Sequence, residues 1–394
     1  MRRTADPAVA VEVVATFDDL DAAEWDELAA AGAPERASFY LSARWLSFVE
    51  QDRSATARYV LIRHRDRLVG ALPLYQVHAE ENEAYRPERV LDGWGSRTCL
   101  LAGPRRGYVN GLLAATDLAP PEQSAVRHGL LAAVDERVRA TDGVDAACFL
   151  YLDTTAAAAL AAAPGCSIPQ LVDADAWLPL PGTTFEDYLA GLSAQARTNC
   201  RHESRTFAAA GLSLELTSIG QCWAEAGPLL GQVQRRYGHG GSDQAYRAAL
   251  ARHAELLDDL SVVVAARRGG RLVAFALFYQ WRDSLNLRMV GFDYDALPGA
   301  FEYFTVAFYE PIRYAYANGL RRIQLGRESY QAKVRRGGRL RPLWAVLRAD
   351  PATAPTPGAG AADTRRGNAR RLAGLQRQLS PSWLTGAEWT RWQE

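Results

Sequence analysis

The 394-residue chain lacks the features that mark membrane proteins and disulfide-rich proteins. No apolar run approaches the ~18 residues that a transmembrane helix needs, and the N-terminus leads into no apolar signal core. The five cysteines form no C-x-x-C pair, and the six histidines show neither H-x-x-x-H spacing nor an acid-flanked cluster. We therefore expect a cytoplasmic protein with reduced thiols, no bound metal and no membrane contact.

Lysine is almost absent, because the 45 basic residues are 44 arginines and one lysine, Lys333. Such an arginine bias is typical of a GC-rich genome. A lysine ammonium is compact and its pKa falls on desolvation, whereas arginine keeps its proton. The single lysine is therefore a candidate functional residue, with chance survival of an exposed lysine as the alternative.

Charge is balanced over the whole chain but not along it. The 45 basic and 45 acidic residues cancel, yet residues 301–394 contain 16 basic and 7 acidic residues, a net charge of +9. A basic C-terminal part favours a polyanionic partner or a phosphorylated ligand. The alternative is that these arginines only solvate the surface and the tail.

An internal repeat indicates two related domains. Residues 67–76 and 271–280 match without a gap at an offset of 204, with five of ten positions identical. Each copy follows another β-rich run across a short polar turn, as in a hairpin, and precedes a helix and a strand. We predict mixed α/β domains with mostly antiparallel sheets at 1–175 and 176–350. A flexible linker and a basic, Trp-containing tail follow at 351–394.

The segment 326–337 is the strongest candidate for chemistry. It begins where the apolar strand 323–325 ends, and ligands bind at the carboxyl ends of strands in α/β sheets. Tyr330 and Lys333 are three residues apart, so a helix would place them on one face. The sole lysine therefore lies in the most polar strand-end segment of the chain.

A second candidate lies at the junction between a strand at 285–290 and the following helix. Asp293 and Glu302 flank this junction, and carboxylates placed there can hold or deprotonate an amine. The alternative is structural, with Asp293 capping a turn and Glu302 favouring a helix N-terminus. The candidate catalytic residues are thus Lys333, Tyr330, Asp293 and Glu302, and the candidate substrate-binding residues are Glu328, Arg327, Tyr294, Arg288 and Tyr237.

Arginines form the third candidate feature. Arg197, Arg201 and Arg205 recur every four residues on one face of a helix predicted at 184–210. This row is either a solvated face or a phosphate-binding face. A basic, glycine-rich loop at 103–111 is a weaker candidate for a phosphate cradle. The candidate phosphate- or tRNA-binding residues are Arg197, Arg201, Arg335 and Arg336.

The pattern G-x-x-x-Y-x-x-K-x-x-x-G at Gly326, Tyr330, Lys333 and Gly337, together with the element order, resembles the Fem-type (FemABX-like) branch of the GNAT N-acyltransferases. The resemblance covers roughly residues 10–348 and implies two tandem GNAT-like domains. Fem-type members move an aminoacyl group from a charged tRNA to an amine, whereas other GNAT enzymes use acyl-coenzyme A.

The sequence departs from the coenzyme A pattern of that superfamily. Coenzyme A-dependent members carry (Q/R)-x-x-G-x-(G/A) after their fourth strand, but residues 291–295 at this junction are acidic and would repel a pyrophosphate. Residues 235–240 fit the string but lie at the end of a predicted helix. We therefore expect aminoacyl-tRNA as the donor, a small-molecule or peptide amine as the acceptor, and no cofactor.

The expected activity is amide-bond formation, with natural-product biosynthesis as the favoured setting and cell-wall cross-bridge formation as the second. One alternative is an N-acyltransferase of the same fold that uses acyl-coenzyme A or an acyl carrier protein. The other is a non-catalytic module that binds tRNA or a glycan.

Overall fold

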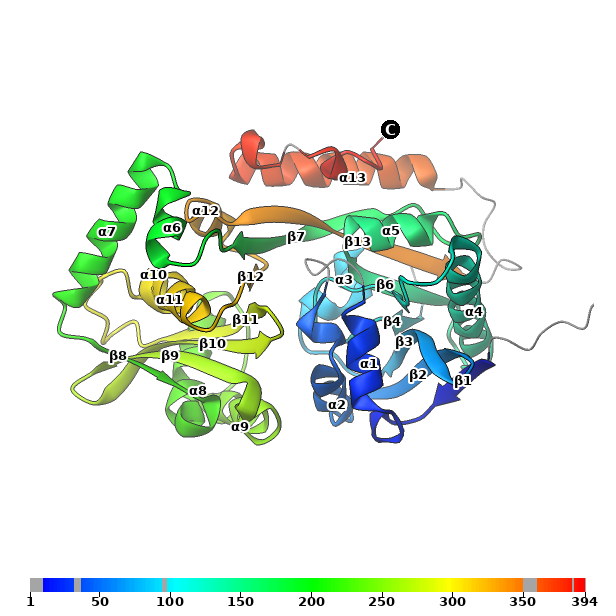
Figure 1. Cartoon of the computed structure of the whole chain (residues 1–394), viewed down its shortest axis with the longest axis horizontal. Coiled ribbons are helices and arrows are strands. Elements are labelled where there is room, and N and C mark those ends of the chain that lie inside the picture. Colours follow the sequence, from blue (N-terminus) through cyan, green and yellow to red (C-terminus); the bar gives the residue numbers. More distant parts are fainter. Residues whose placement is uncertain (1–9, 32–36, 94–97, 350–359, 385, 394) are drawn as a thin grey trace, which may run out of the picture. The chain divides into compact units, whose positions relative to one another are not determined.

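A computed structural model of the chain describes residues 10–31, 37–93, 98–349, 360–384 and 386–393 (Figure 1). The chain divides into two compact units, one formed by Met1–Ala174 with Arg341–Glu394 and the other by Asp175–Leu340. We call them unit 1 and unit 2. The predicted domain ranges stay predictions, and the compact units differ from them in that residues 341–350 lie with unit 1.

Unit 1 is built on a mixed sheet. Its strands, in the order in which they neighbour one another, are β1 (Ala10–Val14), β2 (Ala55–His64), β3 (Arg67–Val77), β4 (Cys99–Ala102), β6 (Ala146–Leu152) and β13 (Arg339–Ala349), and the short β5 (Leu113–Ala114) pairs with β3. Its α-helices are α1 (Ala22–Ala29), α2 (Ala43–Glu50), α3 (Pro87–Val90), α4 (Pro120–Arg139), α5 (Thr154–Ala161) and α13 (Ala361–Gln378).

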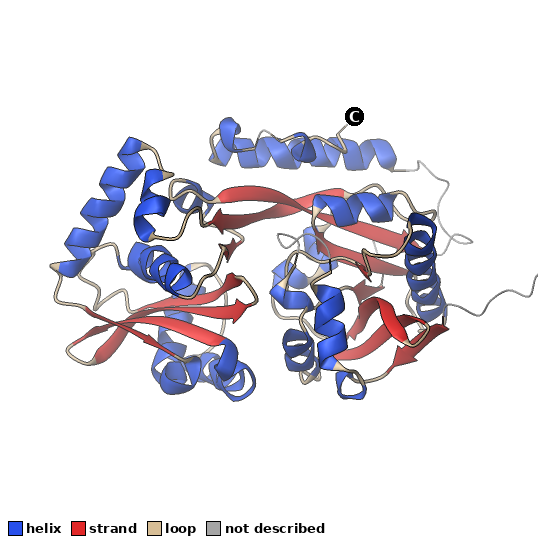
Figure 2. Cartoon of the chain, in the orientation of Figure 1, coloured by secondary structure: helices blue, strands red, loops and turns tan. Residues whose placement is uncertain are grey.

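Unit 2 has the same kind of sheet. Its strand order is β7 (Gln170–Pro179), β12 (Arg322–Gly326), β11 (Ser284–Phe292), β10 (Arg271–Trp281), β9 (Ser261–Arg268) and β8 (Ser213–Thr217). Its helices are α6 (Phe185–Ala190), α7 (Ala194–Ala208), α8 (Ile219–Arg236), α9 (Asp243–Leu257), α10 (Glu302–Phe304), the π-helix η6 (Thr305–Tyr309), α11 (Glu310–Ala317) and α12 (Tyr330–Val334). Figure 2 shows helices on both faces of the unit 2 sheet. Strands β7 and β13 each begin in one unit and end in the other. The predicted mixed α/β class is therefore confirmed.

The hairpins of the internal repeat are confirmed. Strand β3 and strand β10 have bounds that differ by 204 residues at both ends, and each pairs antiparallel with the strand before it. The turn residues correspond as well, because Arg65 and Asp66 in unit 1, like Gly269 and Gly270 in unit 2, all have positive φ. A two-residue turn with both φ values positive matches the twist of the flanking strands. Both units therefore build the same hairpin with different turn residues.

The helix predicted at 184–210 is in fact two helices. It breaks after Gly191, and α7 begins anew with Ser193 as its cap, whose hydroxyl accepts a hydrogen bond from the Ala196 amide at 3.2 Å. The helical segment that follows the second copy of the repeat, Glu302–Ala317, is also irregular, since it contains the π-helix η6 just before Pro311. Proline has no N–H to donate to the preceding turn, so the regular hydrogen-bond ladder cannot pass this point.

The C-terminal tail contains a docked helix. Residues 350–359 of the predicted linker lie outside the described residues. Within α13, the Asn368 amide nitrogen donates to the Pro169 carbonyl at 2.9 Å, and its oxygen accepts from the Leu171 amide at 2.8 Å. Asn368 is buried. The described part of the tail therefore belongs to unit 1.

Close packing of α8 on α9 gives a test of the fold of unit 2. A Cβ placed on Gly227 would lie 2.8 Å from the Arg247 Cα and 2.9 Å from its nitrogen, so backbone would have to move. We expect Gly227→Ala to destabilise unit 2 by about 1–3 kcal/mol in urea denaturation, because overpacking outweighs the gain in helix propensity.

Gly374→Ala in α13 is the matched control. Its added Cβ would meet only the Arg377 side chain, at 3.7 Å. It should stabilise the protein by up to about 1 kcal/mol through helix propensity alone. Equal effects of the two substitutions would show that α8 and α9 do not pack as closely as described.

Candidate active site in unit 2

The site begins where two parallel strands separate. Strands β11 and β12 pair over three residue pairs only, from Ser284↔Arg322 to Asn286↔Gln324. Strand β11 then continues to Phe292, whereas β12 pairs through Gly326 with Ala176 of β7 on its other side. Residues 287–290 of β11 are half-buried. Beyond Asn286, β11 therefore has no pairing with β12 on that side. This unpaired edge lies at the carboxyl ends of the two parallel strands, where α/β proteins bind ligands.

In unit 1, Asn110 occupies the position that corresponds to the unpaired edge of β11. Strands β4 and β6 also run parallel, from Cys99↔Ala146 to Ala102↔Phe149. Beyond them Asn110 bridges to β6, and its amide donates to the Tyr151 carbonyl at 2.9 Å. Among the described residues of unit 2, no bridge of this kind lies beside β11. Unit 2 is therefore the better candidate for a site.

The loop after β12 has an unusual backbone. Gly326, Glu328 and Ser329 have φ values of 71°, 65° and 47°, in the left-handed region. For residues other than glycine this conformation costs free energy, and it persists only where the surroundings hold it. Such strained backbone is concentrated at functional sites, so the loop identified from sequence is also unusual in structure.

The buried side chain of Lys333 forms hydrogen bonds with the backbone of this loop. Its ammonium donates to the Gly326 carbonyl at 3.0 Å and to the Arg327 carbonyl at 2.7 Å, and the side chain is 2% exposed. A compact ammonium fits between two carbonyls of one turn, whereas a planar guanidinium needs more room. The structure thus gives the sole lysine a positioning role, and its direct part in catalysis stays a prediction.

Tyr330 lies beside Lys333, as the i, i+3 spacing predicted. The Lys333 ammonium is 5.9 Å from the centre of the Tyr330 ring, and Tyr330 is buried. Of the two predicted substrate contacts on this loop, Glu328 is exposed and Arg327 is half-buried. The loop therefore presents a carboxylate outward and keeps its lysine and tyrosine inward.

Arg336 does not have the position expected of a phosphate-binding residue. It is buried, and its guanidinium donates to both carboxylate oxygens of Glu203 at 2.8 and 2.6 Å and to the Tyr309 hydroxyl at 3.1 Å. The guanidinium carbon also lies 3.2 Å from the centre of the Phe304 ring. Its donors are used within the protein, which argues against the predicted phosphate contact. Instead, Arg336 joins the end of α12 to α7 and η6.

The two predicted catalytic carboxylates differ in their surroundings. Asp293 follows β11, is 3% exposed, and forms an ion pair with Arg271. Glu302 is 5% exposed, and one of its oxygens accepts a hydrogen bond from the Ala300 amide at 2.9 Å. Among the described residues Glu302 has no ion-pair partner. A buried carboxylate without a cation is poised to accept a proton or hold an ammonium, so Glu302 is the stronger candidate.

Aromatic side chains connect these segments. Phe292 contacts Tyr294 and Tyr303, with ring centres 6.0 Å apart in both cases. Burial raises the pKa of Tyr303 to about 12, although a hydrogen bond to Ser329 lowers it in part. The hydroxyl of Tyr303 therefore stays protonated at neutral pH. The sequence analysis did not select Tyr303 or Ser329, although both lie within the motifs that it singled out.

The predicted contacts on α8 and β11 lie at the edge of this aromatic group. Tyr237 is 59% exposed and Tyr294 is 37% exposed. The Arg236 guanidinium lies 4.6 Å from the centre of the Tyr294 ring. Residues 235–240 thus end α8 as predicted, yet they approach the strand–helix junction in space. Arg288, in β11, is half-buried.

The remaining predicted phosphate contacts lie on helix surfaces. Arg197 is half-buried and donates to the Leu192 carbonyl at 2.6 Å, which secures the start of α7. Arg201 has a side chain 57% exposed and pairs weakly with Glu186 at 3.3 Å. Arg335 is exposed. Arg201 and Arg335 are therefore the predicted residues best able to meet a polyanion.

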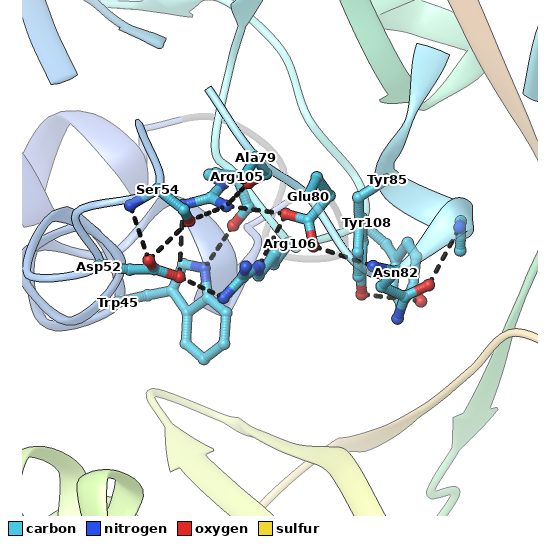
Figure 3. Close-up of polar contacts among 11 residues, drawn as sticks. Trp45, Asp52, Ser54, Ala79, Glu80, Asn82, Tyr85, Arg105, Arg106 and Tyr108 are labelled. Atoms are coloured by element: carbon cyan, nitrogen blue, oxygen red, sulfur yellow. Dashed lines mark hydrogen bonds and ion pairs between the residues drawn. The ribbon is translucent and has the colours of Figure 1, made fainter. Parts of the chain in front are cut away.

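The basic loop at 103–111 in unit 1 is not an open phosphate cradle. Arg105 and Arg106 both contact Glu80, at 2.9 and 2.8 Å, and Arg106 also contacts Asp52 at 2.6 Å (Figure 3). Burial raises the pKa of Asp52, but hydrogen bonds from Ser54 and the two arginines outweigh it and hold the pKa at about 2. The Asp52 carboxylate is therefore ionised at neutral pH, and both arginines form ion pairs with Asp52 and Glu80.

The described residues contain neither a membrane-spanning helix nor a metal-binding cluster. No described helix has the length and apolarity needed to cross a membrane. Within the same part of the chain, no three histidine, cysteine or acidic side chains cluster in a way that would hold a metal ion. The predicted absence of a metal stays a prediction.

Comparison with known protein families identifies the family of this chain. Residues 112–350, more than half of the chain, match the FemAB-like family of peptidoglycan biosynthesis and recognition. The chain belongs to the FemAB-like family. No curated protein matches it. This membership confirms the predicted Fem-type resemblance. Together with the tandem GNAT-like fold, it supports a transferase of the acyl-transferring class.

Solved structures share the fold of this FemAB-like protein. A FemX structure is 10% identical over 86% of this chain and 98% of its own, with a TM-score of 0.58. A tandem GNAT protein from the clavulanic acid biosynthesis pathway is 13% identical over 87% and 99%, with a TM-score of 0.51. A protein of unknown function from Bacteroides thetaiotaomicron is 13% identical over 84% and 98%, with a TM-score of 0.52. At such identities the likeness establishes the fold alone.

The position of Lys333 makes its replacement informative. Lys333→Arg keeps the charge but cannot keep both carbonyl contacts, so the strained loop should shift. We expect the transfer rate to fall on the order of 10²-fold, while circular dichroism shows a folded protein. Arg339→Lys, a charge-conserving change at an exposed residue at the start of β13, is the control and should leave the rate unchanged. Near-full turnover of Lys333→Arg would contradict a role for this lysine.

Proposed function

We propose that this FemAB-like protein is an aminoacyl-tRNA-dependent N-acyltransferase that forms an amide on the amine of a small molecule or peptide. The observation that carries the proposal is Glu302, a buried carboxylate without an ion-pair partner among the described residues. It opens the helix that follows β11, close in sequence to the separation of β11 from β12. An amine acceptor must lose a proton to form an amide, and Glu302 is suited to accept it.

The proposed reaction follows from the chemistry of an aminoacyl ester. The amine nitrogen attacks the ester carbonyl, Glu302 takes a proton from that nitrogen, and the bond from the carbonyl carbon to the ribose oxygen breaks. The ribose oxygen takes up a proton as it leaves. Because the ester is already activated, the protein mainly has to orient the amine and stabilise the oxyanion. The loop held by Lys333 and Tyr330 is the proposed source of that stabilisation.

Residues at the strand–helix junction support tRNA over coenzyme A as the donor. Asp295 places an exposed carboxylate at the junction where coenzyme A-dependent GNAT enzymes grip a pyrophosphate, and repulsion would weaken that grip. Fem-type members, as the resemblance implies, take their acyl group from aminoacyl-tRNA. Natural-product assembly remains the favoured setting because of the GC-rich, actinomycete-like composition.

A donor panel tests the proposal. The protein is incubated with candidate amines and one of three donors: labelled aminoacyl-tRNA, acyl-coenzyme A or an acyl carrier protein. We expect amide product from aminoacyl-tRNA, abolished by RNase treatment of the donor. RNase-insensitive turnover with acyl-coenzyme A alone would overturn the proposal. Binding of tRNA without product would indicate a non-catalytic module.

Substitution of the two carboxylates distinguishes their roles. Glu302→Gln keeps the hydrogen bond from Ala300 but removes the base, so we expect single-turnover transfer to fall by about 10²–10⁴-fold with a raised pH optimum. Asp293→Asn removes an ion pair and should mainly lower stability. A larger loss of rate in Asp293→Asn than in Glu302→Gln would assign the base to Asp293.

Salt dependence tests the arginines. Arg201→Gln and Arg335→Gln should each make log affinity for tRNA less steeply dependent on log salt, by about 0.7–0.9. Tyr303→Phe, which removes no charge, is the control and should leave the slope unchanged. Unchanged slopes in both arginine variants would show that these residues belong to a solvated face.

A further inference from the structure

Unit 1 contains a small, partly open cavity far in sequence from the proposed site. Its volume is about 60 Å³, and its polar lining residues include Thr56, Arg58, Gln76, Arg137 and Thr141. A buried water needs about 10–15 Å³ of such space, so the cavity has room for about four waters or one tetrahedral oxyanion. It contains no carboxylate.

The regular structure of unit 1 brings the polar lining together. Thr56 pairs with Gln76 and Arg58 with Leu74 across the β2–β3 hairpin, so these four side chains share one face of the sheet. Arg137 is three residues after the buried Val134 on α4 and therefore faces inward. Two arginines from separate elements thus line one cavity.

Neither guanidinium is neutralised within the described part of the chain. Arg58 donates to the Ala57 carbonyl at 2.7 Å, and neither it nor Arg137 forms an ion pair there. Both arginines are half-buried. The arginines of loop 103–111, in contrast, are paired with Glu80 and Asp52. Two unneutralised cations lining a small polar cavity favour an anion between them.

The other polar groups define what such an anion would meet. The Thr141 hydroxyl donates to the Arg137 carbonyl at 2.7 Å, and Thr56 shares a hydrogen bond of 2.8 Å with His78. Gln76 has no side-chain hydrogen bond within the described residues, so its amide is available. The cavity thus offers two guanidinium groups and one amide as donors.

The position of Arg137 at the end of α4 offers a structural reason for this arginine that needs no bound anion. Arg137 is in the last turn of this helix, where a cation offsets the negative end of the helix dipole. This accounts for a cation at position 137. It does not account for Arg58, which is on β2, or for the lack of a carboxylate in the lining.

We infer that this cavity binds a small oxyanion, the phosphate or sulfate group of a small molecule or a carboxylate, held by Arg58, Arg137 and Gln76. The cavity has room for one such group. The site lies in unit 1, which lacks the opening described for unit 2. It is independent of the proposed transferase activity.

Titration calorimetry of the full chain with inorganic phosphate, sulfate and acetate, at constant ionic strength, tests the site. We expect saturable binding of at least one of these ions, and the strongest binder identifies the class of oxyanion. Arg58→Gln and Arg137→Gln should each weaken it at least about tenfold, because each removes a charge-assisted contact. Arg127→Gln, on α4 but outside the lining, is the matched control.

Circular dichroism confirms that each variant is folded, so loss of binding cannot be ascribed to unfolding. No saturable binding of any of the three ions to the wild-type chain would overturn the inference. Equal weakening by Arg127→Gln would also overturn it, because it would show general attraction to a basic surface.

Discussion

The separation of β11 from β12 is the constraint on which the candidate site depends. Parallel pairing ends after Asn286↔Gln324, and β12 pairs at Gly326 with β7 instead. The chain must then turn within a few residues, which places Glu328 and Ser329 in the left-handed region. Lys333 stabilises that turn by filling it with its ammonium. The site is therefore a consequence of how one strand changes partners.

A buried ion pair between Arg336 and Glu203 connects the segment after this turn to α7. Removing one partner of the Arg336–Glu203 pair would leave an uncompensated buried charge, at a cost of about 3–5 kcal/mol. Tyr188 adds a hydrogen bond from its hydroxyl to the Arg336 carbonyl at 3.1 Å. In unit 1 the related place is bridged by Asn110, and the charges of loop 103–111 neutralise one another. The two units thus share a fold but not an opening.

Local patterns made much of the fold predictable. Repeated β-rich runs joined by short polar turns identified both hairpins, and the i, i+3 spacing placed Tyr330 beside Lys333. Contacts between distant residues were not predictable from one sequence. Arg336 meets Glu203, 133 residues away, and Asp293 meets Arg271 on the neighbouring strand. The folded chain alone shows that Arg336 and Asp293 are each paired with an opposite charge.

Hydrogen–deuterium exchange with a tRNA minihelix carrying an amide-linked aminoacyl group tests most directly whether the site lies in unit 2. This analogue can bind but cannot transfer its acyl group. The account predicts slower exchange in residues 287–304 and 326–335, around the separated strands and the loop held by Lys333. Slower exchange confined to unit 1, with residues 287–335 unchanged, would contradict it.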